Sequence, residues 1–318
     1  MLRSLRLGIL LGVALSYFAP AANAQRVELG GAEEKQIRVD GRERTYLVVA
    51  PRATRGPFPL VLVLHGGGGT AWQMERYTRF NALARRERFV VCYPEGVEKH
   101  WNCGRQIPQE TTYRDNVDDV KFIRQLVDQL AKDLPIDRER VFATGISNGA
   151  FMSHRLAAEA SDVLRGIAPV VGGMAESVAG HFHPVRPVSL FVIQGTADPL
   201  VPYHGGEVGP DLIRRRGKFV DTDVAVAKYL ALNEIDPQSA DVQTIDGDRD
   251  DGCTTEATRY APGKQAARVQ LYRVKEGGHA WPGRWQYAPE NRIGKASRDF
   301  DATVEIWKFF ASLGTDGR

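Results

Sequence analysis

The chain has 318 residues, of which 43% are hydrophobic and 25% are charged, and its formal net charge at neutral pH is +3. This composition is sufficient to bury one large core, and the sequence contains neither repeats nor low-complexity linkers. The near-neutral charge balance gives no argument for binding nucleic acid or an anionic membrane surface.

The first 24 residues have the pattern of an export signal. The apolar part is too short to span a membrane, and no cysteine follows the cleavage site to carry a lipid anchor. We therefore expect cleavage after Ala24, a secreted or periplasmic protein with no stable membrane anchor, and a single catalytic domain over residues 25–318. The signal consists of a basic start at Arg3 and Arg6, an apolar core over 7–19 and the small residues Ala22-Asn-Ala24.

Beyond the signal, apolar runs typical of strands alternate with amphipathic segments typical of helices. Residues 36–49 predict a hairpin that turns at Asp40-Gly41, and 203–219, rich in glycine and arginine, is expected to be loop. The alternation predicts an α/β fold with a mostly parallel central sheet covered by helices on both faces. Strands are expected near 60–64, 89–93, 140–145, 167–171, 188–194 and 268–274, and helices near 75–87, 117–133, 148–160, 222–233 and 298–312.

The segment from Arg140 to Ala150 is the most informative part of the chain. It is an apolar, β-branched stretch that ends at Gly145-Ile-Ser-Asn-Gly149 and continues as an amphipathic segment over 151–159. A strand, a sharp turn and a helix are the context of a nucleophile elbow, which holds a serine in a strained backbone conformation at its apex. The sequence therefore predicts Ser147 as a nucleophile.

A serine hydroxyl needs a base to take its proton and an acid to orient that base. In hydrolases with this elbow, the order along the chain is serine, acid, histidine. Asp198 follows the apolar run 188–194, and His279 follows the alternating run 268–275, so both are expected where strands end. We predict a catalytic triad of Ser147, Asp198 and His279.

Four glycines, Gly66 to Gly69, follow the strand expected near 60–64 and expose backbone N–H groups. One of them, which we assign to Gly67, is expected to form an oxyanion hole with the N–H of Asn148. A phosphate-binding loop is the alternative, but no Lys-Ser or Lys-Thr pair ends the run. His65, at the head of the loop, is expected to form a structural hydrogen bond.

These motifs together resemble the family of polyhydroxybutyrate depolymerases and feruloyl esterases over roughly residues 35–312. The resemblance implies an α/β-hydrolase fold and a serine carboxylic-ester hydrolase, with Ser147 as nucleophile, Asp198 as orienting acid and His279 as base. The motifs that carry it are Leu64-His-Gly-Gly, Tyr93-Pro-Glu-Gly96, Trp101-Asn102, Val117-Asp-Asp-Val-Lys-Phe-Ile123, Gly145-Ile-Ser-Asn-Gly149, Gly195-Thr-Ala-Asp-Pro199 and Gly277-Gly-His-Ala-Trp-Pro-Gly283.

The expected substrates are small soluble esters or oligoesters of the short hydroxyalkanoate or feruloyl type. After His279 the sequence holds only a polar loop at 284–294 and one helix, with no linker of the kind that joins a polymer-binding domain. Trp101 and Trp281 are expected either to line an acyl or alcohol pocket or to pack at its rim. A peptidase or amidase with the same triad, and a binding protein on a hydrolase scaffold, are the alternatives.

The remaining reactive side chains predict one disulfide and no metal or other cofactor. Cys103 and Cys253 lie in loops beside glycine and are expected to pair after export, whereas Cys92 lies in an apolar strand. The pair His181 and His183 has no third ligand in pattern, and the acidic loop 246–252 departs from the calcium-binding pattern.

Overall fold

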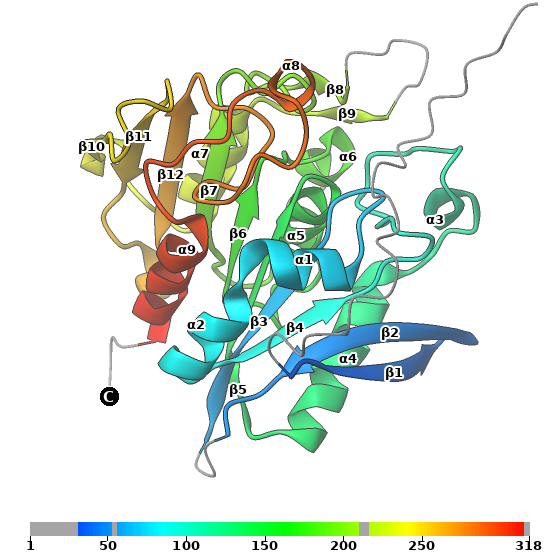
Figure 1. Ribbon diagram of the computed structural model, residues 1–318. Coiled ribbons are helices and arrows are strands. Elements are labelled where there is room, and N and C mark those ends of the chain that lie inside the picture. Colours follow the sequence, from blue (N-terminus) through cyan, green and yellow to red (C-terminus); the bar gives the residue numbers. More distant parts are fainter. Residues whose placement is uncertain (1–30, 53–55, 210–215, 315–318) are drawn as a thin grey trace, which may run out of the picture. The chain divides into compact units, whose positions relative to one another are not determined.

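The computed structural model describes residues 31–52, 56–209 and 216–314 (Figure 1). The expected export signal lies outside these residues. Ala32–Arg318 form one compact unit, and the description below concerns this unit.

A ten-stranded sheet runs through the unit in the order β1-β2-β4-β3-β5-β6-β7-β12-β11-β10. The six neighbours from β4 to β12 pair in parallel, and antiparallel strands extend the sheet at both edges. The predicted, mostly parallel sheet is therefore confirmed. The strands are β1 (Glu33–Val39), β2 (Arg42–Val49), β3 (Phe58–Leu64), β4 (Val90–Pro94), β5 (Ile136–Ile146), β6 (Gly166–Val170), β7 (Ser189–Gly195), β10 (Asp241–Ile245), β11 (Thr254–Arg259) and β12 (Val269–Lys275), and a separate ribbon is formed by β8 (Gly206–Glu207) and β9 (Lys218–Phe219).

Helices cover the sheet on both faces, and each face has its own hydrophobic core. Alternate residues of β3 divide between them: Leu60 and Leu62 belong to one core, and Val61 and Val63 to the other. A strand covered on both faces reads as an unbroken apolar run, which is why the parallel strands could be recognised in the sequence.

The first core is closed by α4, α5 and α7, and the second by α1, α2 and α9, which lie on opposite sides of the sheet (Figure 1). The helices are α1 (Ala71–Thr78), α2 (Phe80–Glu87), α3 (Thr111–Arg114), α4 (Asp119–Asp133), α5 (Asn148–Glu159), α6 (Glu176–Gly180), α7 (Thr222–Leu232), α8 (Glu290–Ile293) and α9 (Ala302–Ala311), with short 3₁₀ turns at Pro237–Ser239, Lys264–Ala266 and Ser312–Gly314.

Three local features differ from the sequence prediction. The single helix expected at 75–87 is two helices, because Arg79 adopts a left-handed conformation with φ of 60° between them. The loop expected at 203–219 contains the ribbon of β8 and β9. Strands β10 and β11 were not predicted. For β10 the reason is that its residues are largely exposed and polar, so the strand shows no hydrophobic alternation.

The N-terminal hairpin was predicted correctly. Strands β1 and β2 pair in register with Val39 opposite Arg42, and the turn residues Asp40 and Gly41 both have positive φ. Two successive residues with positive φ favour an Asp-Gly pair, which is the turn chemistry expected of a two-residue hairpin.

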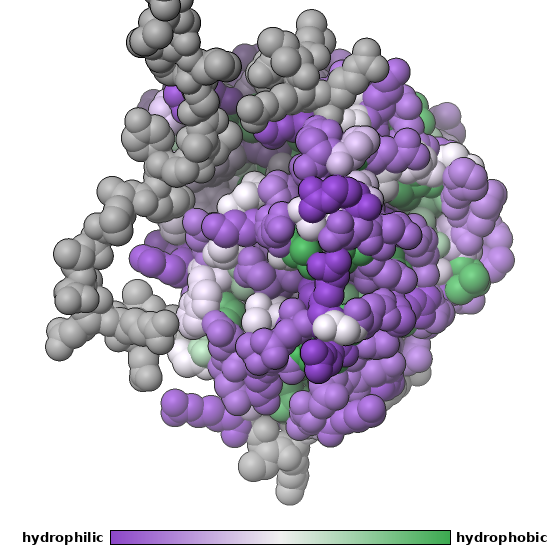
Figure 2. All heavy atoms as spheres, turned by 90° about the vertical axis from the view of Figure 1, so that its right-hand side faces the viewer, coloured by the Kyte–Doolittle hydropathy of each residue, from purple (hydrophilic) through white to green (hydrophobic). Residues whose placement is uncertain are grey.

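The face that carries α3 and the ends of β1 and β2 is mainly hydrophilic, and its hydrophobic residues are scattered (Figure 2). Within the described part of the chain, no helix combines the length and hydropathy needed to cross a membrane.

Parallel strands direct their carboxyl ends to one edge of the sheet, and the segments singled out from the sequence meet there. Gly66 to Gly69 follow β3, Ser147 follows β5, Asp198 follows β7 and His279 follows β12. Segments far apart in the sequence are thereby brought to one place, as ligand sites in open α/β sheets require.

Candidate active site

Ser147 lies at a strained turn between β5 and α5. Its backbone has φ of 55° and ψ of −118°, and α5 begins at the next residue. The flanking glycines allow the close approach of strand and helix: a Cβ built on Gly149 would lie 2.3 Å from the carbonyl oxygen of Leu64, and one on Gly145 would lie 2.6 Å from the same atom. Both glycines are therefore required for steric reasons, as the elbow motif predicted.

Asp198 and His279 form a buried hydrogen-bonded pair. His279 Nδ1 lies 2.7 Å from Asp198 Oδ2, and both residues are almost inaccessible to solvent. The other carboxylate oxygen of Asp198 accepts the N–H groups of Leu200 and Val201 at 2.8 and 2.9 Å. Because the carboxylate accepts the proton on Nδ1, the neutral imidazole has Nε2 free to act as a base.

The backbone of the histidine loop is also held in place. The N–H of His279 donates to the carbonyl oxygen of Ile293, and Gly278 donates to Lys295 at 2.8 Å. A Cβ on Gly195, at the end of β7, would lie 2.3 Å from the carbonyl oxygen of Gly277. This close contact joins the loops that carry the acid and the base.

The glycine loop after β3 leaves two N–H groups available. Gly68 donates to the carbonyl oxygen of Lys99, and Gly69 donates to Gly66, both at 2.9 Å. The structure records no acceptor for the N–H of Gly66 or Gly67 among the described residues. A Cβ on Gly67 would lie 3.6 Å from Cβ of Asn148, whose N–H is at the free first turn of α5. Among the four glycines, the candidates for the oxyanion-hole N–H are therefore Gly66 and the predicted Gly67.

His65 holds the glycine loop through hydrogen bonds of both ring nitrogens. Its Nδ1 donates to the carbonyl oxygen of Gly66 at 2.8 Å, and its Nε2 accepts the N–H of Gly96 at 2.9 Å. Burial lowers the pKa of His65 to about 4, so the ring is neutral near pH 7. The expected structural hydrogen bond of His65 is confirmed.

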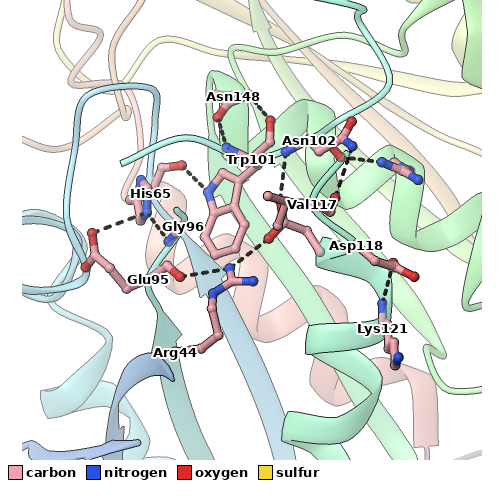
Figure 3. A network of polar contacts seen from close by, with 12 residues as sticks. Arg44, His65, Glu95, Gly96, Trp101, Asn102, Val117, Asp118, Lys121 and Asn148 are labelled. Carbon is pink, nitrogen blue, oxygen red and sulfur yellow. Dashed lines mark hydrogen bonds and ion pairs between the residues drawn. The ribbon is translucent and has the colours of Figure 1, made fainter. Parts of the chain in front are cut away.

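The side chain of Asn148 ties the start of α5 to the segment after β4 (Figure 3). Its Oδ1 accepts the N–H of Trp101 at 2.7 Å, and its Nδ2 donates to the Trp101 carbonyl oxygen at 3.2 Å. The Trp101 indole N–H in turn donates to the carbonyl oxygen of His65 at 2.9 Å. Asn148 is thus positioned both through its helix and through its side chain.

A buried ion pair between Arg44, labelled in Figure 3, and Asp119 supports the same segment. Arg44 on β2 donates to Asp119 Oδ1 at 2.7 Å, and the N–H of Asn102 donates to the second oxygen, Oδ2, at 2.8 Å. Arg44 also donates to the carbonyl oxygen of Glu95 at 3.1 Å. One carboxylate therefore connects the N-terminal hairpin to the residue that follows Trp101.

Of the two expectations for Trp101 and Trp281, lining a substrate pocket is wrong, and packing beside the site agrees with the structure. Both side chains are 0% exposed. Trp281 belongs to the core closed by α9, and its indole N–H donates to Thr303 Oγ1 at 3.1 Å. Trp101 belongs to the opposite core and is held by His65 and Asn148. Both indoles brace the loops around the site instead.

Two exposed aromatic residues in the segment expected to be a polar loop pack beside the loop that carries the histidine. Trp285 is 49% exposed and Tyr287 is 40% exposed, and both rings pack edge-on against Tyr77. Tyr77 is tied to the loop that carries the histidine, because its hydroxyl accepts the N–H of Trp281 at 3.2 Å. The signal in the sequence was two aromatic residues in a short segment directly after the predicted base.

The predicted disulfide between Cys103 and Cys253 is also wrong, because all three cysteines are free and buried. The two thiols belong to cores on opposite faces of the sheet. The sulfur of Cys103 lies 3.2 Å from Asn148 Nδ2 and 3.1 Å from the hydroxyl of Tyr113. Cys92 packs in the core, as predicted.

The acidic loop between β10 and β11 is held by contacts within the chain. Asp248 pairs with the Arg298 side chain at 2.6 Å, and Asp251 accepts the N–H of Cys253 at 2.6 Å. Among the described residues, no group of three or more His, Cys, Asp or Glu side chains is arranged to hold a metal ion.

Comparison with known proteins shows which family the chain resembles. The profile of the family described as Esterase PHB depolymerase matches residues 44–191. NocK from Nocardia uniformis subsp. tsuyamanensis, which is named as an esterase, is 33% identical over 280 residues, covering 85% of this chain and 80% of NocK.

Two further relatives are matched over a smaller part of their length. Feruloyl esterase B from Piromyces equi is 25% identical over 237 residues, covering 70% of this chain and 39% of the relative. Poly(3-hydroxyalkanoate) depolymerase C from Paucimonas lemoignei is 36% identical over 120 residues, covering 36% of this chain and 28% of the relative. The chain thus spans less than half of these two proteins.

Among solved structures, acetyl xylan esterase from Aspergillus awamori is similar, with a TM-score of 0.54 at 12% identity over 78% of this chain and 94% of that chain. The structure of sOPH has a TM-score of 0.50 at 17% identity over 85% and 96% of the two chains. At these identities the likeness concerns the fold, and the α/β-hydrolase fold predicted from the sequence is confirmed.

Proposed function

Because the chain belongs to the Esterase PHB depolymerase family and is an esterase, we propose that it is a serine carboxylesterase whose triad is Ser147, His279 and Asp198. The observation that carries this proposal is the buried pair of His279 and Asp198, 2.7 Å apart, at the sheet edge where the elbow presents Ser147.

In the proposed mechanism, Ser147 Oγ attacks the ester carbonyl while His279 Nε2 takes the hydroxyl proton. Asp198 holds the proton on Nδ1 and stabilises the imidazolium that forms. The N–H groups of Gly67 and Asn148 bind the negative charge on the carbonyl oxygen. His279 returns the proton to the leaving alcohol, and a water molecule then hydrolyses the acyl-enzyme by the same route.

The proposed substrates are small soluble esters or oligoesters of the short hydroxyalkanoate or feruloyl type. The names of the relatives support the ester classes, and the exposed rings of Trp285 and Tyr287 offer apolar contact area beside the histidine loop. We expect turnover of short p-nitrophenyl esters, hydroxybutyrate oligomers or methyl hydroxycinnamates. Efficient clearing of a crystalline polyester film with no turnover of these esters would contradict this proposal.

The triad is tested by hydrolysis of p-nitrophenyl acetate. Ser147→Ala and His279→Ala should each lower kcat by a factor on the order of 10⁴ to 10⁶, and the double variant should lose little more. Asp198→Asn should cost about 10⁴-fold, because it favours the wrong imidazole tautomer.

The matched control is Ser153→Ala on the same helix, whose hydroxyl donates to the carbonyl oxygen of Gly149 within α5. It should retain most of the activity. Near-normal turnover in Asp198→Asn, with another aspartate essential, would refute the assignment of the acid.

We propose further that residues 1–24 are removed during export and that residues 25–318 form one catalytic domain. The basic, apolar and small-residue pattern of the first 24 residues supports export. Intact mass of the protein recovered from cell fractions should correspond to a chain beginning at Gln25. A full-length chain confined to the cytoplasm would contradict the proposal.

A further inference from the structure

The segment 95–101 folds as a tight hairpin against the glycine loop. Val97 and His100 form a β-bridge, and the hairpin accepts the N–H of Gly68 at the carbonyl oxygen of Lys99. Gly96 donates to the ring of His65 from the other side. The hairpin is therefore held beside the two free N–H groups of the proposed oxyanion hole.

His100 places its ring against Gly67. A Cβ built on Gly67 would lie 3.4 Å from His100 Nε2 and 3.6 Å from Cβ of Asn148. A Cβ on the preceding glycine, Gly66, would lie 3.4 Å from Cβ of Ser147. The His100 side chain is 32% exposed, so its ring is accessible to a molecule that binds beside Gly67.

The hydrogen bonds of His100 fix which ring nitrogen is available. Nδ1 lies 2.8 Å from the carbonyl oxygen of Glu98, which can only accept, so Nδ1 carries the proton of the neutral ring. Nε2 is then an acceptor. Its nearest recorded polar neighbour is Glu110 Oε1 at 3.7 Å, which is too long for a hydrogen bond.

Glu110 has unused accepting capacity as well. Its second oxygen, Oε2, is buried, and the described residues provide it with no hydrogen-bond partner. Two acceptors, the imidazole Nε2 and the Glu110 carboxylate, thus lie next to each other, and no donor among the described residues is recorded between them. A hydroxyl group that enters beside the His100 ring can donate to Nε2 or to Oε1 of Glu110.

We propose that His100 and Glu110 form a subsite that recognises a hydroxyl group carried close to the ester carbonyl of the substrate. This inference rests on the proposed function, because it requires the ester to be bound at Ser147. A hydroxyl that donates to His100 Nε2 would be held on the side of the carbonyl that faces Gly67. His100 is then a specificity-determining residue and is not required for the chemistry itself.

The test compares matched esters with and without a hydroxyl group. The pair that differs on the acyl side is p-nitrophenyl 3-hydroxybutyrate and p-nitrophenyl butyrate. The pair that differs on the alcohol side is 2-hydroxyethyl butyrate and propyl butyrate, whose hydrolysis is measured by pH-stat titration. The ratio of kcat/KM within at least one pair should favour the hydroxylated ester in the wild type. His100→Phe, which keeps a flat ring without nitrogen, should lower that ratio by roughly five-fold, the effect of one partly exposed hydrogen bond.

Two further variants make the outcome specific. Glu110→Gln replaces one carboxylate oxygen, an acceptor, by an NH₂ donor and should also lower the ratio of kcat/KM. If His100→Phe does not fold, Glu110→Gln tests the subsite by itself. His204→Phe changes a histidine that is 83% exposed and pairs with Asp221, and it should leave the ratio unchanged.

The proposal is overturned if wild type and variants show the same ratio in both ester pairs while hydrolysis of the plain ester persists. That result would leave the proposed function intact. Turnover of both esters by Ser147→Ala, in contrast, would refute the proposed function itself.

Discussion

Replacing Asp119 by asparagine tests the buried support of the hairpin 95–101. Asp119 is 0% exposed and Arg44 is 4% exposed, so the charge of Arg44 would lose its partner inside the protein. Arg44 cannot move easily, because its guanidinium also lies 3.8 Å from the centre of the Phe122 ring. Removing one member of such a pair typically costs about 3–5 kcal/mol of unfolding free energy.

The structure adds a second contribution to this loss. Asp119 accepts both Arg44 and the N–H of Asn102, one at each oxygen. An asparagine has only one acceptor oxygen, so one of the two buried donors loses its partner, which typically costs about 1–3 kcal/mol. The two costs overlap, and we expect a total of about 3–5 kcal/mol, measured from urea unfolding curves with an unchanged m-value.

A double-mutant cycle identifies the pair as the cause. Arg44→Met removes the unpaired charge, so the variant with both changes should be more stable than Asp119→Asn alone. The control is Asp128→Asn, whose ion pair with Arg138 is more than half exposed and should contribute less than about 1 kcal/mol. Additive losses in the cycle, or a loss in Asp119→Asn as small as in the control, would refute the reasoning.

Three further predictions concern pH, thiols and the elbow. Burial lowers the pKa of His65 to about 4 and of His154 to about 3, so between pH 6.5 and 4 only the unfolded chain binds these protons. Each ring should therefore lower the unfolding free energy by about 1.4 kcal/mol per pH unit as the pH falls, and the slope from urea unfolding should be shallower in His154→Phe; an unchanged slope would contradict the assignment. When the unfolded chain is alkylated without reductant, intact mass should show three labelled cysteines, because all three are free. A single label would instead support the disulfide between Cys103 and Cys253. Gly149→Ala should cost about 3 kcal/mol and most of the activity, because its Cβ would meet a carbonyl oxygen, whereas Gly180→Ala, which has open space, should cost far less; equal melting temperatures of the two variants would show that the close contact is unimportant.

The parallel part of the fold could be predicted because it is covered on both faces. Strands β3 and β7 are continuous apolar runs, and their predicted limits agree with the structure to within two residues. The antiparallel extension by β10 could not be predicted, because its residues are mostly exposed and its order depends on pairing with β11 rather than on its own pattern.

The candidate triad could be predicted because motif order and strand ends are local properties of the sequence. Side-chain direction is not local. Trp281 lies two residues from His279, yet its indole points to α9, and the sequence interval gave no indication of this. Cys103 and Cys253 both lie in loops, and only the three-dimensional structure shows that the sheet separates them.

The sheet also divides the support of the site between two separately packed layers. Trp101 belongs to the layer that holds α5 and the glycine loop, and Trp281 belongs to the layer that holds the histidine loop. In a variant that keeps either Trp101 or Trp281 as its single tryptophan, with the others replaced by phenylalanine, the fluorescence reports on one layer. Heat inactivation can then be traced to the layer that loosens first, a distinction that a single melting curve does not make.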